Sequence, residues 1–152
     1  MIQRIQSVYL LLATIVTVVA MCLPIGTYLD AQALSMASFT PLGLSLANGD
    51  TTSTWALLVL LLFSALLSLA AIFLFRNRQL QMRTTVFNAL LLLGYYVATV
   101  VFIFMLKDSI GAETFRPGLG LAFPAMSIIF CYLAFRGIYR DDVMVKAADR
   151  LR

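Results

Sequence analysis

The chain has 152 residues, of which 62% are hydrophobic and 12% are charged, and its formal net charge is +4. Because a typical soluble domain carries roughly 25% charged residues, this composition excludes an ordinary water-soluble fold, whose surface so few charges could not cover. The sequence has no histidine and only two cysteines, Cys22 and Cys131, which excludes the common general base and the usual metal-binding and disulfide frameworks.

Charged residues divide the chain into long uncharged segments. Four of them are residues 5–29, 51–75, 84–106 and 117–135. A helix needs about 20 apolar residues to cross the hydrocarbon core of a bilayer. We therefore predict membrane-spanning helices near residues 6–25, 54–75, 85–106 and 119–138. The remaining residues form connections at 26–53, 76–84 and 107–118 and a tail at 139–152.

A further uncharged segment, residues 31–49, has to be tested as a fifth span. It contains Pro41 and Gly49, which interrupt helices. Lys and Arg of short loops stay on the cytoplasmic side of a membrane. Four spans place nine basic residues on the side of the termini and two, Lys107 and Arg116, on the other; five spans place three inside and eight outside. The sequence therefore predicts an all-α, integral membrane four-helix bundle with both termini cytoplasmic.

The basic residues predicted to set this topology lie next to the ends of the spans. They are Arg4, Arg76, Arg78, Arg83, Arg136 and Arg140, supported in the tail by Lys146, Arg150 and Arg152. A cleaved signal peptide is the competing interpretation of the N-terminal segment, because residues 31–33 resemble a cleavage site. Its apolar run is longer than the about 7–15 residues of a signal core, so we expect an uncleaved helix.

The connection at residues 26–53 is long for a compact domain. Leu42, Leu44 and Leu46 recur at every second position, a period typical of a strand. Two interpretations remain open. One is a small β-hairpin or a segment that lies on the membrane surface, and the other is an irregular loop.

Residues 107–118 and 76–84 form the two shorter connections. The second is a tight basic turn, so the second and third helices should be antiparallel neighbours. The tail at residues 139–152 has a helical pattern, in which Asp142 and Lys146 lie four residues apart. It is either a basic amphipathic helix on the anionic membrane surface or a solvated continuation of the fourth helix, and the second is favoured.

The spans contain few groups that could carry chemistry. Arg136, near the end of the fourth span, is the only charged residue inside a predicted span. The absence of charge deeper in the spans disfavours ion-coupled transport, because such transporters usually need an ionisable group at membrane depth. The sequence has no glycine-rich phosphate loop, nucleophile elbow or Cys-x-x-Cys pair, and its basic residues are too few for a nucleic-acid footprint. We therefore predict no enzyme activity, catalytic residue, cofactor, metal or nucleic-acid partner.

Small residues form two candidate packing faces, since small side chains let helix backbones approach closely. The faces consist of Ala13, Thr17 and Ala20 in the first helix and of Ser64, Ser68 and Ala71 in the second. Tyr95 and Tyr96 follow Gly94 near the middle of the third helix, and we expect a tyrosine hydroxyl there to bond a Ser or Thr across the bundle. A lipid- or quinone-contacting aromatic site is the alternative. Pro124 is expected to bend the fourth helix. Cys22 and Cys131 lie at different depths, so we expect no disulfide between them.

The first and last residues of the chain point to a known family. Residues 1–12 (MIQRIQSVYLLL) and 148–152 (ADRLR), together with the four spans, resemble an uncharacterised bacterial inner-membrane family known only as a domain of unknown function. The resemblance covers essentially the whole chain. It implies a multi-pass protein of the bacterial inner (plasma) membrane and transfers no catalytic residue. The long first outer loop also resembles the layout of claudin-like tetraspan proteins, whose signature residues are absent.

We expect a non-enzymatic membrane protein, an accessory, scaffold or assembly component that acts through its helix faces and first outer loop. Its expected partners are the lipid bilayer and either a second copy or another membrane protein. One alternative is a small oligomeric transporter or channel for a neutral or lipidic solute, with a cavity lined by Thr14, Thr17, Ser64, Ser68 and Tyr95. The other is a lipid-modifying enzyme that would use Asp30, Asp50, Asp108, Glu113 or Arg116.

Overall fold

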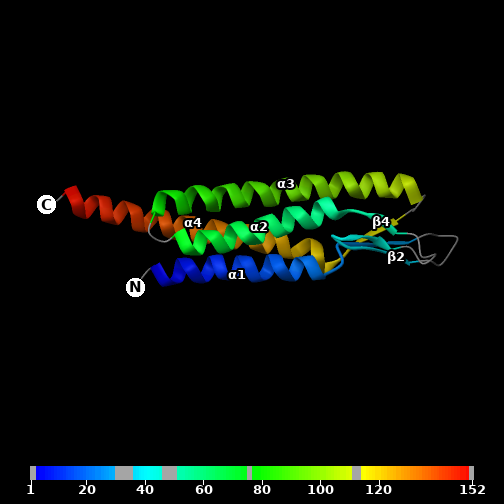
Figure 1. Cartoon of the computed structure of the whole chain (residues 1–152), viewed down its shortest axis with the longest axis horizontal. Coiled ribbons are helices and arrows are strands. Elements are labelled where there is room, and N and C mark those ends of the chain that lie inside the picture. Colours follow the sequence, from blue (N-terminus) through cyan, green and yellow to red (C-terminus); the bar gives the residue numbers. More distant parts are fainter. Residues whose placement is uncertain (1–2, 30–35, 46–50, 75–76, 111–113, 151–152) are drawn as a thin grey trace.

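The computed structural model describes residues 3–29, 36–45, 51–74, 77–110 and 114–150 (Figure 1). Most of them belong to four helices. These are α1 (Gln3–Cys22), α2 (Trp55–Phe73), α3 (Arg78–Ile110) and α4 (Leu119–Arg150). Each helix is long and apolar enough to cross a membrane. The prediction of a mainly helical chain with four such helices is therefore confirmed.

The helices form a closed ring, in which each packs against two others in the order α1, α2, α3, α4 and back to α1. α1 begins and α4 ends at the same end of the bundle, which we call the termini end; the opposite end is the sheet end (Figure 1). α3 begins at Arg78, within the predicted connection at residues 76–84. α4 continues to Arg150, so the tail extends the fourth helix, as the favoured interpretation expected.

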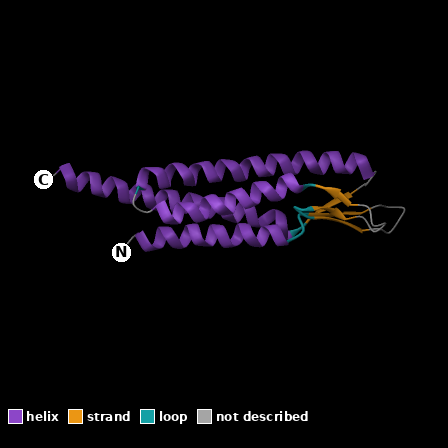
Figure 2. Cartoon of the chain, in the orientation of Figure 1, coloured by secondary structure: helices purple, strands orange, loops and turns teal. Residues whose placement is uncertain are grey.

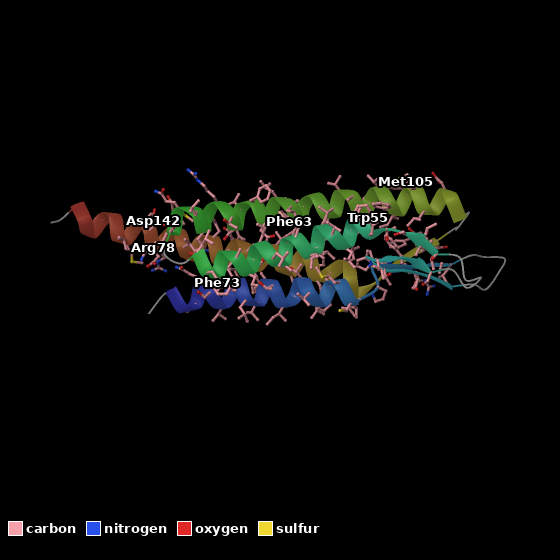
Figure 3. All side chains as sticks on the ribbon, viewed as in Figure 1. Trp55, Phe63, Phe73, Arg78, Met105 and Asp142 are labelled. Atoms are coloured by element: carbon pink, nitrogen blue, oxygen red, sulfur yellow. The ribbon has the colours of Figure 1, made fainter. Side chains whose placement is uncertain are left out.

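The helices distribute their side chains in the opposite way to a soluble bundle. Small and polar residues share the interior with a few buried leucines, and Ala13, Thr17 and Ser64 have no exposed surface. Large apolar residues face outward. Figure 3 shows this for Phe63 and Phe73 of α2, whose exposed fractions are 49% and 70%. Such an arrangement suits a lipid surrounding, in which small interior residues allow close helix packing and the outer surface needs no charge.

Five strands form one antiparallel sheet beyond the sheet end of the bundle (Figure 2). They are β1 (Gly26–Leu29), β2 (Met36–Phe39), β3 (Gly43–Ser45), β4 (Thr51–Ser53) and β5 (Thr114–Pro117). Their order is β4-β3-β2-β1-β5, so the segment 26–53 supplies four strands and the segment 107–118 supplies the fifth. The all-α prediction lacked this sheet, because the pairing of β1 with β5 joins residues that are distant in the sequence.

Of the two interpretations of residues 26–53, the structure supports the one with strands. Within β3, Leu44 is 1% exposed and is more buried than Gly43 and Ser45 on either side of it. Leu42 precedes the strand and is 65% exposed, so it does not share the buried face of Leu44 that the period of two predicted. Leu46 lies outside the described residues. The described parts of the segment 26–53 therefore belong to the sheet and to the turns that adjoin it.

One apolar core joins the sheet to the bundle. It contains Tyr28 and Phe39 from the sheet together with Leu57 and Leu92 from the helices, each at most 1% exposed. A smaller cluster of helical residues, Leu10, Ala71 and Ala134, lies closer to the termini end. Burial of this shared core fixes the position of the sheet relative to the helices.

Candidate functional site

The predicted α2 face packs around an amide on α3. Ser64 Oγ donates a hydrogen bond to Asn88 Oδ1 over 2.7 Å, and Asn88 Nδ2 donates to Ser68 Oγ over 2.7 Å. The same amide nitrogen donates to Cys131 Sγ of α4 over 3.5 Å. Ala71, the third residue of this face, is 1% exposed. Asn88 therefore joins three helices through side chains that are all buried.

The predicted α1 face packs against α4. Ala13, Thr17 and Ala20 are each at most 1% exposed. The hydroxyls of Thr17 and Ser127 lie 2.8 Å apart, and Ser127 Oγ also donates to the carbonyl of Ala13 over 3.2 Å. Both predicted small-residue faces thus lie in the interior, and each meets a polar side chain of a neighbouring helix.

The two tyrosines in the middle of α3 differ in their surroundings. Tyr96 donates its hydroxyl hydrogen bond to the carbonyl of Leu121 in α4. Tyr95 has no exposed surface, and its hydroxyl has no hydrogen-bond partner among the described residues. The expected bond from a tyrosine of this pair to a Ser or Thr across the bundle is therefore wrong for the described residues, because Tyr96 reaches across to a backbone carbonyl instead. α4 continues as a helix on both sides of Pro124.

The predicted topology-setting arginines whose side chains the structure describes lie in α3 and α4. Arg78 and Arg83 are in the first turns of α3, and Arg136 and Arg140 lie in the part of α4 that leads to the termini end. Arg78 forms an ion pair with Asp141 over 3.5 Å between Nη2 and Oδ2. Arg76 and the side chain of Arg4 lie outside the described residues. Cys22 is exposed, Cys131 is buried, and both are free thiols.

Backbone hydrogen bonds join the start of α4 to the junction between α1 and β1. The amide of Gly118 donates to the carbonyl of Ile25 over 2.7 Å, and that of Gly120 donates to the carbonyl of Pro24 over 3.0 Å. A Cβ on Gly120 would lie 2.5 Å from the Pro24 oxygen, closer than van der Waals contact allows. Glycine is thus required here for the two backbones to approach.

Tyr28 connects the sheet to α3. Its hydroxyl donates to the carbonyl of Ile103 over 3.2 Å, and its ring centroid lies 5.0 Å from that of Phe115 in β5. Burial raises the pKa of Tyr28 to about 12, so the hydroxyl remains a donor at neutral pH. β1 is therefore held by its neighbouring strands and by the backbone of α3.

α3 alone continues past the level at which α2 begins (Figure 1). The hydrogen bonds of Asn88 with Ser64 and Ser68 fix the relative height of the two helices. Counting from these bonds, antiparallel packing places Trp55, the first residue of α2, level with about residue 99 of α3. The rest of α3 extends about 16 Å further, at 1.5 Å per residue.

Apolar side chains cover one face of this extension. We call them the outer α3 strip: Val100, Val101, Phe104 and Met105, with exposed fractions of 48%, 50%, 64% and 63%. Their spacing places them on a single helical face. Ile103 and Leu106 on the other side of α3 pack in the core shared with the sheet. Figure 3 shows Met105 on the side of α3 that faces away from the sheet.

The chain matches one protein family over nearly its whole length. Residues 2–151 match the family described as Domain of unknown function (DUF4293). The chain belongs to this family. The resemblance drawn from residues 1–12 and 148–152 is thereby confirmed as one to a domain of unknown function. No curated protein matches the chain.

The acidic and basic residues considered for lipid chemistry do not form a cluster within the described residues of this DUF4293 member. Asp108 at the end of α3 and Arg116 in β5 are exposed. Asp30, Asp50 and Glu113 lie outside the described residues. The described residues also include no group of three or more Cys, Asp or Glu side chains that could hold a metal ion. The features that the structure does assemble are packed helix faces, the sheet and the outer α3 strip.

Proposed function

We propose that the chain is a multi-pass protein of the bacterial inner membrane, with four helices across the bilayer and both termini in the cytoplasm. α2 supports the spanning: its 19 residues are about 28 Å long, close to the roughly 30 Å of a hydrocarbon core. Trp55, 63% exposed at one end of α2, suits the membrane interface. Nine basic residues lie on the side of the termini and two on the other side, a distribution that favours a cytoplasmic location for the termini end.

In this topology the chain acts as a non-enzymatic assembly component. It binds the extracytoplasmic part of another membrane chain, a second copy included, through the outer α3 strip. The strip is the observation that carries the proposal. In this topology α2 begins at the outer membrane boundary, so Phe104 and Met105 rise about 8 Å above that boundary at 1.5 Å per residue. The span predicted from the sequence, residues 85–106, placed both residues inside the membrane instead. Large apolar side chains exposed together to water are typical of a surface that a partner covers.

The surroundings of the strip favour tight binding. Tyr28 and the core residue Leu106 hold the extension of α3 against the sheet, so the strip is presented on a fixed support. This surface is already in its binding conformation, so binding a partner does not cost free energy for ordering it. Lys107 and Asp108, which follow the strip and are exposed, supply a polar margin.

Site-specific photo-crosslinking in native membranes tests the partner. A photoreactive phenylalanine analogue at Met105 should give a discrete protein adduct on a gel, identified by mass spectrometry. The matched control is the same analogue at Phe63, which is also exposed but lies in the middle of α2. We expect only lipid adducts there. A Met105 position that reacts with lipid alone would contradict the assembly role.

Cysteine labelling tests the topology separately. In a Cys22→Ser background, Lys107→Cys and Arg140→Cys place one thiol at each end of the bundle, at exposed positions. A membrane-impermeant maleimide should label Lys107→Cys in intact cells and Arg140→Cys only after permeabilisation. The reverse pattern would overturn the orientation, and labelling of both in intact cells would overturn the four-span topology.

The transporter alternative gains less support from the same geometry. Four of its five proposed lining residues, Thr17, Ser64, Ser68 and Tyr95, are at most 1% exposed. The hydroxyls of Thr17, Ser64 and Ser68 bond to side chains of neighbouring helices. Thr14, the fifth, donates to the carbonyl of Leu10 in its own helix. These residues fill the interior instead of lining a path through it.

A further inference from the structure

We infer that a groove between α3 and α4, near the termini end, seats one anionic phospholipid of the cytoplasmic leaflet. Arg83 binds its phosphate, and an acyl chain lies along the apolar part of the groove. The inference rests on the topology proposed above and is independent of the partner of the outer α3 strip.

The groove is an open hollow of about 370 Å³ on the outside of the bundle. It is lined by Met82, Arg83, Val86, Phe87, Leu90 and Phe135. Arg83 is the only charged residue of this set. Val86, Phe87 and Leu90 are 42%, 53% and 59% exposed, so they form an outward surface that meets the surrounding lipid. A concave apolar surface of this kind fits a hydrocarbon chain better than a flat helix face does.

The groove lies where the apolar part of each helix ends. Arg83 directly precedes the uncharged segment 84–106 of α3, and Phe135 is the last residue of the uncharged segment 117–135. From the bonds of Asn88, the last residue of α2, Phe73, is level with about residue 81 of α3. Arg83 is therefore within about 3 Å of the inner membrane boundary. From this position its aliphatic side chain can extend to the boundary and place the guanidinium among the lipid headgroups.

Charge selects the kind of lipid. Arg83 is exposed, and the ion pair that the described residues form involves Arg78 and Asp141 instead. A guanidinium offers two parallel N–H donors to a phosphate. The cytoplasmic leaflet contains anionic lipids. Both facts favour an anionic phospholipid over a zwitterionic one.

A second basic hollow adjoins the groove along α4. It has a volume of about 450 Å³ and is lined by Arg136, Tyr139, Arg140, Val143 and Met144. The ring of Tyr139 stacks on Phe135 at a centroid distance of 6.3 Å, so the two hollows meet at this pair. Asp142 lines a different hollow, with Asn77 and Arg78. The lipid headgroup thus lies in basic surroundings.

Native mass spectrometry of the full chain tests whether the groove binds an anionic phospholipid. The protein is released from bilayers of equal phosphatidylglycerol and phosphatidylcholine, and the ratio of the two retained lipids is measured. We expect wild type to retain phosphatidylglycerol preferentially. Arg83→Gln should lower the ratio about fivefold, the factor that corresponds to one basic residue at an anionic surface. Lys107→Gln removes the same charge at the sheet end and should leave the ratio unchanged.

Three results would overturn the inference: no preference in wild type, an unchanged preference in Arg83→Gln, or equal losses in both variants, which would indicate net charge alone. Glycerol 3-phosphate, which lacks acyl chains, should not displace the lipid; displacement would remove the role of the apolar groove. Thermal unfolding in a non-ionic detergent should show that Arg83→Gln is folded, since Arg83 is exposed. The lipid ratio is measured on the isolated chain, so a failed crosslink at Met105 leaves it unaffected.

Discussion

The two ends of the bundle are held together in different ways. At the sheet end, strands from two distant segments pair, and backbone amides of Gly118 and Gly120 bond to Ile25 and Pro24. At the termini end, the helices meet through side chains, and one ion pair joins α3 to α4 within the described residues. Backbone contacts leave little room for substitution, whereas side-chain contacts can be replaced. We therefore expect the sheet end to be the more sensitive to single changes.

Gly120→Ala should have the largest effect. The added methyl group would lie 2.5 Å from the Pro24 carbonyl oxygen and 2.8 Å from that of Leu23, both backbone atoms that cannot turn away. Overpacking of this kind costs about 3 kcal/mol. Thermal unfolding in mild detergent should show a clearly lower midpoint, and hydrogen exchange should increase at the start of α4.

Gly94→Ala is the matched control for this change. A Cβ at Gly94 in α3 would meet no atom of the described residues within 4 Å. Alanine is the better helix former, so we expect a gain of up to about 1 kcal/mol. Equal unfolding midpoints for the two alanine variants would contradict the close backbone contact at the sheet end.

Asn88→Ala tests the hydrogen-bonded connection of three helices in the middle of the bundle, between its two ends. It removes the partner of Ser64 and Ser68, which remain buried. Hydrogen bonds between membrane helices are individually modest, so the sum should be about 1–2 kcal/mol. Thr84→Ala, on the same helix, removes a hydroxyl that donates only to the carbonyl of Leu80 and should change stability by less than about 0.5 kcal/mol. A similar loss in both variants would argue against the three-helix connection.

The difference between the ends also explains what the sequence could predict. The helices follow from local properties, because uncharged segments and flanking arginines lie next to one another in the chain. Charges limit the apolar span but not the helix, so α3 continues past Lys107 to Ile110 although the predicted span ends near residue 106. The sheet depends on partners far away: β5, with Arg116 and Pro117, has no strand pattern until it pairs with β1.

The candidate sites follow the same division. Ser64 and Ser68 could be predicted as a packing face because their spacing is local. Asn88, their partner, was visible as the one amide within the third uncharged segment, but its position opposite the two serines depends on how α3 packs on α2. The outer α3 strip could not be predicted, since it exists only because α2 begins at Trp55 while α3 continues.

Tyr28→Phe should weaken the sheet end locally. It removes the hydroxyl that donates to the carbonyl of Ile103 and leaves the ring contacts with Phe39 and Phe115 in place. The expected loss is about 1 kcal/mol. Hydrogen exchange should become faster in β1 and in the part of α3 near Ile103, while α1 and α2 keep their protection. Tyr132→Phe, which is 60% exposed on α4, should leave all of these rates unchanged.

The smallest effect is expected at the ion pair of the termini end. Arg78 and Asp141 are 27% and 15% exposed, and their 3.5 Å separation is longer than that of a strong charge-assisted hydrogen bond. A double-mutant cycle with Arg78→Gln and Asp141→Asn should give a coupling of about 0.5 kcal/mol that decreases with added salt. A coupling above about 2 kcal/mol would be beyond the range of partly exposed pairs. It would mean that the termini end is fixed by a specific contact, as the sheet end is, and that the two ends do not differ in the way proposed.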